Sequence, residues 1–199
     1  MTVKPVGRPL VLPAPRLQPW VRLRSESVAR FRIFEIERSE WADGAGHPRG
    51  DAYVLRGRDW CNVVAVTPDD QVVLCWQYRF GTQALSLEIP GGVIERGEDP
   101  LAAAVRELRE ETGYVADSVE PLVTVDPNPA IQDNRCFTFV ARGAHKVAAT
   151  ELDAQEEIET VLVPACRIAD LLDGGQVRHS LVHSALETFW RRGRTPLSR

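Results

Sequence analysis

One helix-forming segment constrains the fold of this chain more than any other feature, because the sequence marks both its start and its end. Asp99 is a favourable N-cap residue, and Pro100 suits the first position of a helix. Gly113 readily adopts the left-handed conformation that ends a helix. The residues between them, LAAAVRELREET, are rich in strong helix formers. The sequence therefore predicts a helix over residues 100–112.

The periodicity of this helix predicts two different faces. Mainly apolar residues recur at intervals of three and four, which indicates a stripe that packs on a core. The stripe consists of Leu101, Val105, Leu108 and Thr112. On another face, Glu107, Glu110 and Glu111 lie within about 100° of arc. Arg106 lies four residues before Glu110 and can offset only one of these charges.

The clustered carboxylates have two interpretations. They can form a solvated acidic face, although like charges at this spacing destabilise a helix by a few tenths of a kcal/mol per pair. Alternatively, they can bind a hard divalent cation. The preceding residues favour the cation, because a predicted strand runs into Gly91-Gly92 and a loop then brings Glu98 near the helix start. Paired glycines let the backbone approach a ligand closely and free a carbonyl for a metal.

Residues 92–114 together follow the pattern G-x5-E-x7-R-E-x-x-E-E-x-G-hydrophobic. This pattern is the Nudix box, and the chain resembles the Nudix hydrolases, which cleave a nucleoside diphosphate linked to another moiety. The specified positions are Gly92, Glu98, Arg106, Glu107, Leu108, Glu110, Glu111, Gly113 and Tyr114. The aromatic Tyr114 is a mild departure, since an aliphatic residue is commoner there. The resemblance implies an α/β fold with a mixed sheet, in which helices cover both faces as an α/β/α sandwich.

The resemblance also implies a metal site. The glutamates that correspond to Glu107 and Glu111 usually bind the divalent ions, and Glu110 usually shares in binding or supports catalysis. The carbonyl of Gly91 often completes the site, and Arg106 usually orients the carboxylates by ion pairing. We therefore expect Mg²⁺ as the cofactor, with Mn²⁺ as the alternative ion.

Residues outside the box are similar to one branch of the family, the ADP-ribose and nucleoside diphosphate sugar pyrophosphatases. The similarity lies in Trp76-Gln77-Tyr78-Arg79 and in the later run Leu87 to Gly92. In this branch, the arginine at the position of Arg79 usually contacts substrate phosphates, although a surface ion pair is the alternative. Pro129 lies where the branch carries a proline, but Ser-Pro-Gly is commoner than the Asn128-Pro129-Ala130 found here. Substrate preference therefore stays open, and a plain loop proline is the other interpretation.

A second acidic segment precedes the strand expected at 158–163. In this branch, a glutamate in the corresponding loop often acts as the general base, so Glu156 is the first candidate and Glu157 the second. A solvated acidic turn is the alternative. The branch commonly stacks the nucleobase between aromatic side chains, which makes Trp41 a candidate for substrate binding, with core packing as the alternative.

The chain divides into an N-terminal region, 1–58, and a Nudix hydrolase domain, 59–199. Five of the fourteen prolines lie in residues 1–19, which indicates an extended arm. An antiparallel β extension follows, and we expect the whole N-terminal region to serve in dimerisation and base binding. Strands are predicted at 31–36, 53–55, 61–66, 71–77, 122–125, 136–141 and 158–163. Further helices are predicted near 168–172 and 180–191.

Composition limits the partners. Lys and Arg number 24 and Asp and Glu 28, a net charge of −4 that argues against nucleic-acid binding by phosphate neutralisation. No apolar stretch is long enough for a membrane span, and the prolines interrupt any signal-peptide core. The four cysteines indicate buried thiols of a reducing compartment. We expect a cytoplasmic homodimer that binds a small nucleotide-sugar substrate.

These observations favour a Mg²⁺-dependent pyrophosphohydrolase that releases a nucleoside monophosphate and a sugar phosphate. One alternative is a Nudix hydrolase of (d)NTPs or dinucleoside polyphosphates, which the long N-terminal region argues against. Another is a Nudix module that senses a nucleotide without catalysis. The complete set of mutually repelling glutamates on the 100–112 helix argues against that reading, because a sensor has no need to keep them.

Overall fold

The computed structural model describes residues 10–152 and 156–194 and divides them into two compact units. One unit comprises residues 59–125 and 136–194, without the undescribed residues 153–155. The other comprises residues 10–58 together with the distant segment 126–135.

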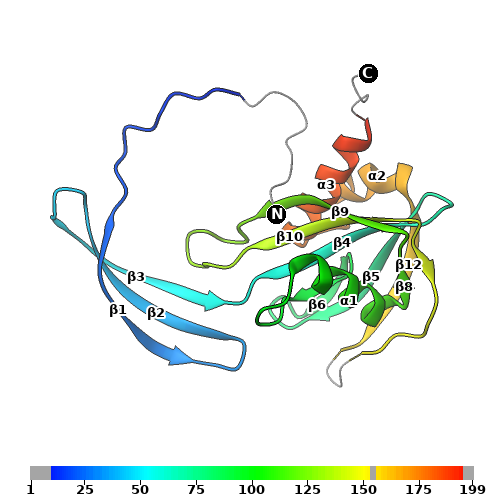
Figure 1. Ribbon diagram of the computed structural model, residues 1–199, viewed down its shortest axis with the longest axis horizontal. Helices are drawn as coiled ribbons and strands as arrows, with labels where there is room; N and C mark the ends of the chain where they lie inside the picture. Colours follow the sequence, from blue (N-terminus) through cyan, green and yellow to red (C-terminus); the bar gives the residue numbers. More distant parts are fainter. Residues whose placement is uncertain (1–9, 153–155, 195–199) are drawn as a thin grey trace. The chain divides into compact units, whose positions relative to one another are not determined.

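A mixed sheet forms the centre of the first unit (Figure 1). Its main strands, in spatial order, are β12 (Ile158–Pro164), β5 (Gln71–Arg79), β4 (Trp60–Val66), β10 (Cys136–Arg142) and β9 (Ser118–Val125). Two short strands extend it, since β6 (Ala84–Glu88) pairs with β5 and β7 (Gly91–Val93) pairs with β4. The β4 and β10 strands run parallel, whereas the other pairs are antiparallel. The short strands β8 (Tyr114–Val115) and β11 (His145–Lys146) form a separate ribbon.

The middle strands are nearly continuous apolar runs because both faces of the sheet are covered. On β4, Val64 and Val66 face a cluster that includes side chains of α2 (Ile168–Asp173) and α3 (Ser180–Arg194). Val63 and Ala65 face the opposite cluster, which includes side chains of α1 (Pro100–Thr112). A single-turn 3₁₀ helix, η1 (Ala165–Arg167), leads into α2. Helices thus cover both faces, which confirms the predicted α/β/α sandwich.

Tight turns set the order of these strands. The β4–β5 hairpin closes where Thr67 and Gln71 bond to each other and Asp70 adopts a positive φ of 58°. The turn confirms the predicted hairpin between the two apolar runs. It places the start of β5 beside the end of β4, so that residues 77–79 project toward the end of the sheet where β7 begins.

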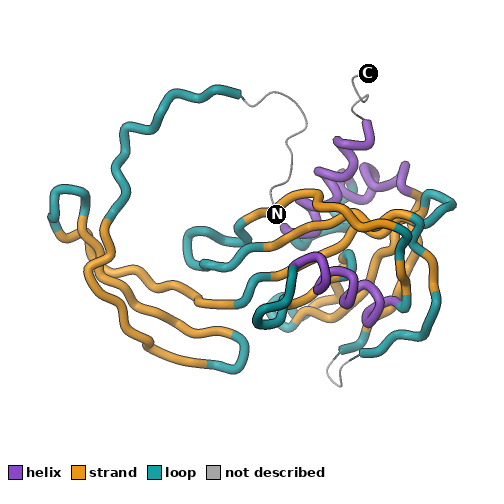
Figure 2. The backbone as a smooth tube through the Cα atoms, viewed as in Figure 1, coloured by secondary structure: helices purple, strands orange, loops and turns teal. Residues whose placement is uncertain are grey.

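The second unit is a three-stranded antiparallel sheet of β1 (Val21–Arg30), β2 (Phe34–Ala42) and β3 (Pro48–Gly57), drawn as orange strands in Figure 2. Cross-strand ion pairs connect its strands, such as Arg38 with Glu26 on β1 at 3.1 Å and with Asp51 on β3. The segment 126–135 belongs to this unit because Arg56 Nη1 donates to Asp133 at 2.8 Å. Residues Val21 and Leu23 of β1 are more than half exposed.

Two predictions were wrong in detail. The strand predicted at 31–36 begins later, at Phe34 of β2, because the N–H of Phe31 donates to the carbonyl of Phe34 and residues 31–33 form the turn after β1. The predicted core stripe of α1 was wrong at one position: Leu108 and Thr112 are buried and Leu101 packs on the core, but Val105 is 43% exposed. Ala103 and Ala104 are fully buried instead. Small alanines let α1 lie close to the sheet and turn Val105 outward. Among the described residues, no helix is both long and apolar enough to cross a membrane.

Candidate active site

The helix α1 begins and ends at the residues that the sequence marked. The carboxylate of Asp99 accepts hydrogen bonds from the backbone N–H groups of Leu101 at 3.0 Å and Ala102 at 3.4 Å. Gly113 has a φ of 73°, and its N–H donates to the carbonyl of Arg109 at 2.8 Å. Because both ends are held, the register of the glutamates relative to the sheet is set.

The Gly91-Gly92 pair opens β7, beside β4 and facing α1, in a space that admits no side chain. A Cβ on Gly91 would lie 2.7 Å from the Cα of Asn62, and one on Gly92 would lie 2.5 Å from the Cδ of Glu107. The N–H of Gly91 donates to the Oε2 atom of Glu111 at 2.8 Å. The sequence predicted a close approach of these glycines to a ligand; the structure shows that they approach the carboxylates of α1.

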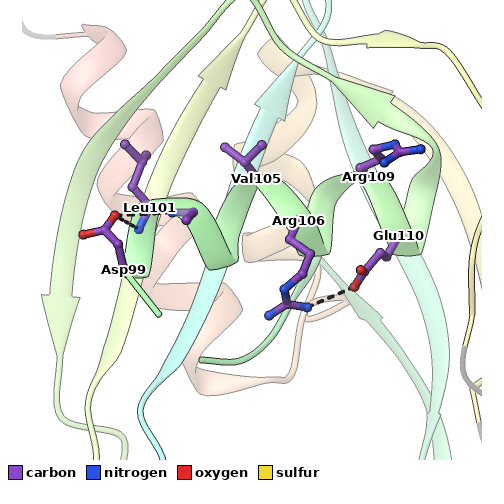
Figure 3. A pocket seen from close by; sticks show the side chains of 7 residues that line it. Asp99, Leu101, Val105, Arg106, Arg109 and Glu110 are labelled. Atoms are coloured by element: carbon purple, nitrogen blue, oxygen red, sulfur yellow. Dashed lines mark hydrogen bonds and ion pairs between the residues drawn. The ribbon is translucent and has the colours of Figure 1, made fainter. Parts of the chain in front are cut away.

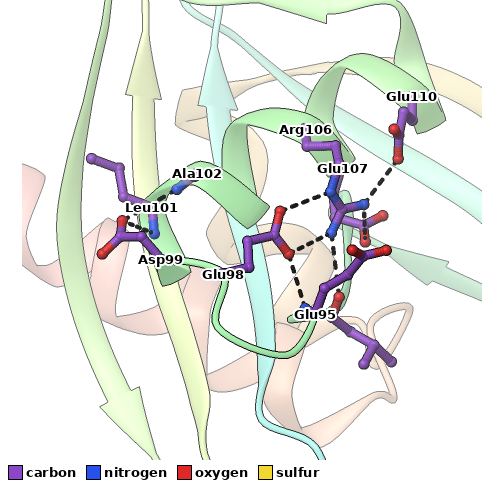
Figure 4. A network of polar contacts seen from close by, with 9 residues as sticks. Glu95, Glu98, Asp99, Leu101, Ala102, Arg106, Glu107 and Glu110 are labelled. Carbon is purple, nitrogen blue, oxygen red and sulfur yellow. Dashed lines mark hydrogen bonds and ion pairs between the residues drawn. The ribbon is translucent and has the colours of Figure 1, made fainter.

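Arg106 gathers three carboxylates around one guanidinium group (Figure 4). Its Nε and Nη2 atoms bind the two oxygens of Glu98 at 2.9 and 3.0 Å. Its Nη1 atom binds Glu107 and Glu110, each at 2.9 Å. These contacts raise the pKa of Arg106 and hold the pKa of Glu98 below its ordinary value. The predicted orienting role thus has a geometric basis, because one planar group ties the loop before α1 to the helix.

Two of the glutamates are largely removed from water. Glu111 is 4% exposed, and burial raises its pKa to about 8, with Glu107 and Glu156 adding to the rise. Burial also raises the pKa of Glu107, although Arg106 opposes the shift. The alternative interpretation, a solvated acidic face, does not hold for Glu111, because this side chain is buried. Buried carboxylates with too little positive charge nearby are a signature of a functional site.

The residues fit a divalent cation by their chemistry, since three carboxylates and a backbone carbonyl are the hard oxygen ligands that such ions prefer. In the part of the chain that the structure describes, no three acidic, His or Cys side chains already form a metal-binding group. The reason is that Glu107 and Glu110 turn toward Arg106, while Glu111 turns toward the N–H of Gly91. Each of these bonds uses one oxygen of its carboxylate, so the other oxygen can bind a cation while Arg106 and Gly91 keep their hydrogen bonds.

Arg79 is held by a partner that the sequence analysis missed. Its Nε and Nη2 atoms form a bidentate pair with Glu88, at 2.8 and 2.7 Å. Glu88 is 3% exposed, and although burial raises its pKa, the bonds and charge of Arg79 outweigh that effect and lower it. Pairing of β5 with β6 places Cys75 opposite Glu88, so Glu88 lies on the α1 face of the sheet. Periodicity alone does not identify a buried glutamate in such a strand.

Glu156 and Glu157 lie just before β12, and both side chains are exposed. The charge of Glu156 contributes to the raised pKa values of Glu107 and Glu111 and to that of Arg79. The structure therefore brings Glu156 near the carboxylates of α1 and the Arg79 guanidinium.

Trp41 and Pro129 belong to the other unit. Trp41 is half-buried on β2, opposite Gly50, and its indole Nε1 is buried without a hydrogen-bond partner among the described residues. Pro129 is exposed in a turn whose first carbonyl, from Asn128, accepts bonds from residues 131 and 132 at 3.0 and 2.8 Å. Their contacts with substrate remain predictions.

The outer face of α1 carries a hollow of about 500 Å³ (Figure 3). Leu101, Ala102 and Val105 form its apolar part, and Arg106 and Glu110 line it as well. Because Arg106 and Glu110 also belong to the carboxylate cluster, this hollow adjoins the cluster along one side of the helix.

Known proteins share this arrangement. The NUDIX domain matches residues 58–183. The methanol dehydrogenase activator of Bacillus methanolicus is 37% identical over 143 residues, 70% of this chain and 75% of that protein. The ADP-ribose pyrophosphatase of Bacillus subtilis (strain 168) is 33% identical over 149 residues, 71% of this chain and 79% of that protein. A crystal structure of an ADP compounds hydrolase superposes with a TM-score of 0.79 at 28% identity, covering 90% of this chain and 98% of that one.

The family match extends well beyond the residues of the glutamate helix. It spans the sheet that carries Arg79, the Gly91-Gly92 loop, α1 and the segment before β12. The fold, the buried carboxylates and the relatives agree, and we conclude that this chain belongs to the Nudix family of hydrolases.

Proposed function

We propose that the enzyme hydrolyses the diphosphate of ADP-ribose or a related nucleoside diphosphate sugar. The observation that carries the proposal is the buried pair Glu107 and Glu111 beneath the Gly91-Gly92 loop, with Arg79 and Glu156 near the same carboxylates. Hydrolysis of a diphosphate requires positive charge near the phosphates and a positioned water. Arg79 can supply the first, and Glu156 can position the second. The name of the Bacillus subtilis relative, ADP-ribose pyrophosphatase, supports this substrate class.

Glu107, Glu110, Glu111 and the carbonyl of Gly91 would hold a divalent cation, with Mg²⁺ as the first choice and Mn²⁺ as the alternative. When bound, the cation supplies charge that neutralises the diphosphate and makes water a better nucleophile. Arg106 keeps the carboxylates of α1 in position, because its planar group binds Glu107 and Glu110 from one side. In this geometry the protein needs only to position the diphosphate and the attacking water and to neutralise negative charge, and no covalent nucleophile is required.

The remaining residues act on the substrate and on water. Arg79 binds a phosphate oxygen through the Nη1 donors that its pair with Glu88 does not use. Glu156 accepts a proton from the attacking water as the oxygen bonds to phosphorus. The bond from that phosphorus to the bridging oxygen breaks, and the products are a nucleoside monophosphate and a sugar phosphate. Glu156 is preferred to Glu157 because its charge is among the main influences on the pKa values of Glu107, Glu111 and Arg79.

The N-terminal unit is proposed to serve substrate binding and association. Trp41 would stack on the nucleobase, and Pro129 would shape the loop that contacts the substrate. We also propose that two copies associate through this unit, which is supported by the exposed apolar residues Val21 and Leu23 of β1. Light scattering tests this at micromolar concentration, where a monomer mass would exclude it. The reaction is assigned to the cytoplasm, with the buried free thiols Cys61, Cys75 and Cys136 as support.

The proposal is tested with Mg²⁺ and a set of substrates that includes ADP-ribose, GDP-mannose, UDP-glucose, NADH, diadenosine polyphosphates and dNTPs. Chromatography should show a monophosphate and a sugar phosphate from one diphosphate sugar. Glu156→Gln should lower kcat by about 10²-fold or more, whereas the matched control Glu157→Gln should leave it nearly unchanged. Cleavage of dNTPs or dinucleotides alone would reassign the substrate class, and binding without turnover of any compound would indicate a sensor.

A further inference from the structure

Gln77 lies on β5, on the face of the sheet that α1 covers. Side chains alternate between the two faces of a strand, and Val73 of the same strand belongs to the cluster that includes side chains of α1. Gln77 follows Val73 by four residues and therefore projects to the same face. Arg79, two residues further on, does so as well. The proposed reaction uses Arg79 of this row and leaves Gln77 without a task.

The ion pair of Arg79 with Glu88 lies at the level of Gln77. The β5–β6 ladder has three successive pairs on this face: Arg79 with Ala84, Gln77 with Ser86, and Cys75 with Glu88. Arg79 and Glu88 are thus offset by four residues of strand, or about 13 Å. Their side chains nevertheless bond at 2.8 and 2.7 Å, so they extend toward each other along the sheet. They meet at the level of the middle pair, which contains Gln77.

The amide group of Gln77 has a donor without an acceptor. Its Nε2 atom is buried and has no hydrogen-bond partner within the part of the chain that the structure describes. Such an unpaired donor costs free energy, and in native proteins it often marks a functional site. The other buried side-chain atoms of this kind among the described residues belong to Trp41, Asn62 and His179, none of which lies on β5. Gln77 therefore combines an unpaired donor with a place beside the Arg79–Glu88 pair.

Arg79 offers further donors at the same level of the sheet. Glu88 binds its Nε and Nη2 atoms, which leaves Nη1 outside the pair. Donors of two neighbouring side chains are thus available on one face of β5. A phosphate oxygen is the acceptor that suits both, because it accepts several hydrogen bonds and its charge strengthens each of them. A cation or an apolar group in this place would leave the Gln77 amide unpaired.

We propose that Gln77 is a substrate-binding residue, whose Nε2 atom donates a hydrogen bond to a phosphate oxygen of the diphosphate beside Arg79. This inference rests on the proposed function, because it takes Arg79 as a phosphate ligand. The free protein carries the unpaired donor, and the substrate supplies its acceptor. Glu88 takes part by holding the guanidinium group of Arg79 at the level of the amide.

Gln77→Met tests the amide, since methionine is unbranched like glutamine but has no donor. We expect kcat/KM for the diphosphate sugar to fall roughly 10- to 100-fold, as for the loss of a hydrogen bond to a charged group. The matched control, Gln71→Met, makes the same change at the first residue of β5, where the amide donates to the carbonyl of Asp69 at 3.3 Å. Its kcat/KM should change by about twofold at most. A change that small in Gln77→Met would overturn the proposal.

Urea unfolding separates substrate binding from a structural role of the amide. Removal of an unpaired buried donor should leave the unfolding midpoint of Gln77→Met unchanged or raise it, even though the activity falls. An amide that stabilises the fold would instead show a lower midpoint together with the lower activity. That joint loss would overturn the proposal.

Calorimetry with inorganic pyrophosphate and Mg²⁺ tests the phosphate contact without turnover. The Kd of Gln77→Met should be about 10-fold higher than that of the wild-type protein, and the Kd of Gln71→Met should be unchanged. If the wild-type protein cleaves no diphosphate sugar, the proposed function fails, but weaker pyrophosphate binding by Gln77→Met still supports the contact. Equal affinities of the wild-type protein and Gln77→Met, or no binding by either, would overturn the proposal.

Discussion

Glu111→Gln should make the metal-free protein more stable while it abolishes most activity. Glu111 is buried, so its charged form is disfavoured and its pKa rises from 4.5 to about 8. The unfolded chain restores the ordinary pKa. Between these two values the folded state binds the proton and the unfolded state does not, so the contribution of this group to stability is lost as pH rises toward 8. A glutamine keeps the oxygen that accepts from Gly91 and carries no charge.

The magnitude follows from the two pKa values. At about 1.4 kcal/mol per pKa unit, the wild-type protein should lose about 3 kcal/mol of unfolding free energy between about pH 5.5 and pH 8.5 through Glu111. The variant should not show this loss. The stability advantage of Glu111→Gln over wild type should therefore grow by about 3 kcal/mol across this range. Glu107 has a pKa raised in the same direction and stays in both proteins.

Urea unfolding in a chelator, at both pH values and for both proteins, measures this difference. Added Mg²⁺ at the higher pH should narrow the gap, because an ion that binds the folded state stabilises it and the variant has lost a ligand. The kcat of the variant should fall by several orders of magnitude. If the unfolding free energies of the two proteins change in parallel with pH, the reasoning is refuted. Such a result would show that burial does not raise the pKa of Glu111 in the folded protein.

Three further substitutions test other contacts. Gly113→Ala should destabilise the protein by about 1 to 3 kcal/mol in urea unfolding, because alanine disfavours a φ of 73° and its Cβ meets Ala148. Arg106→Lys should raise the Mg²⁺ concentration needed for half-maximal activity, since an ammonium cannot replace the planar contacts, and an unchanged metal titration would count against its orienting role. Arg79→Ala should destabilise by about 3 kcal/mol because it leaves buried Glu88 unpaired, and Arg79→Ala with Glu88→Gln should recover most of that loss in the same assay.

The parts of the fold that the sequence predicted well are those governed by local chemistry. The limits of α1 follow from Asp99 and Gly113, whose conformational preferences act within a few residues. The β4–β5 hairpin follows from two apolar runs around a polar turn. The glutamate pattern of the Nudix box likewise predicted the carboxylate cluster, because helix geometry alone brings these residues together.

The parts that were missed depend on contacts between distant segments. Val105 was expected in the core, but the close approach of α1 to the sheet at Ala104 turns it outward. The burial of Glu111 follows from the Gly91 loop that covers it. The pair between Arg79 and Glu88 depends on how β5 and β6 align, which no local pattern reveals.

The parallel pairing of β4 with β10 has a consequence for how the site comes into being. Asn62 of β4 is paired with both Gly91 and Thr138, and Thr138 lies about 76 residues further along the chain. During synthesis at about 5–20 residues per second, β10 follows β4 after roughly 4 to 15 seconds. Until then, β4 lacks one neighbour, and the Gly91-Gly92 loop rests on an unfinished sheet. The sheet beside the carboxylate cluster is therefore complete only after β10 has been synthesised.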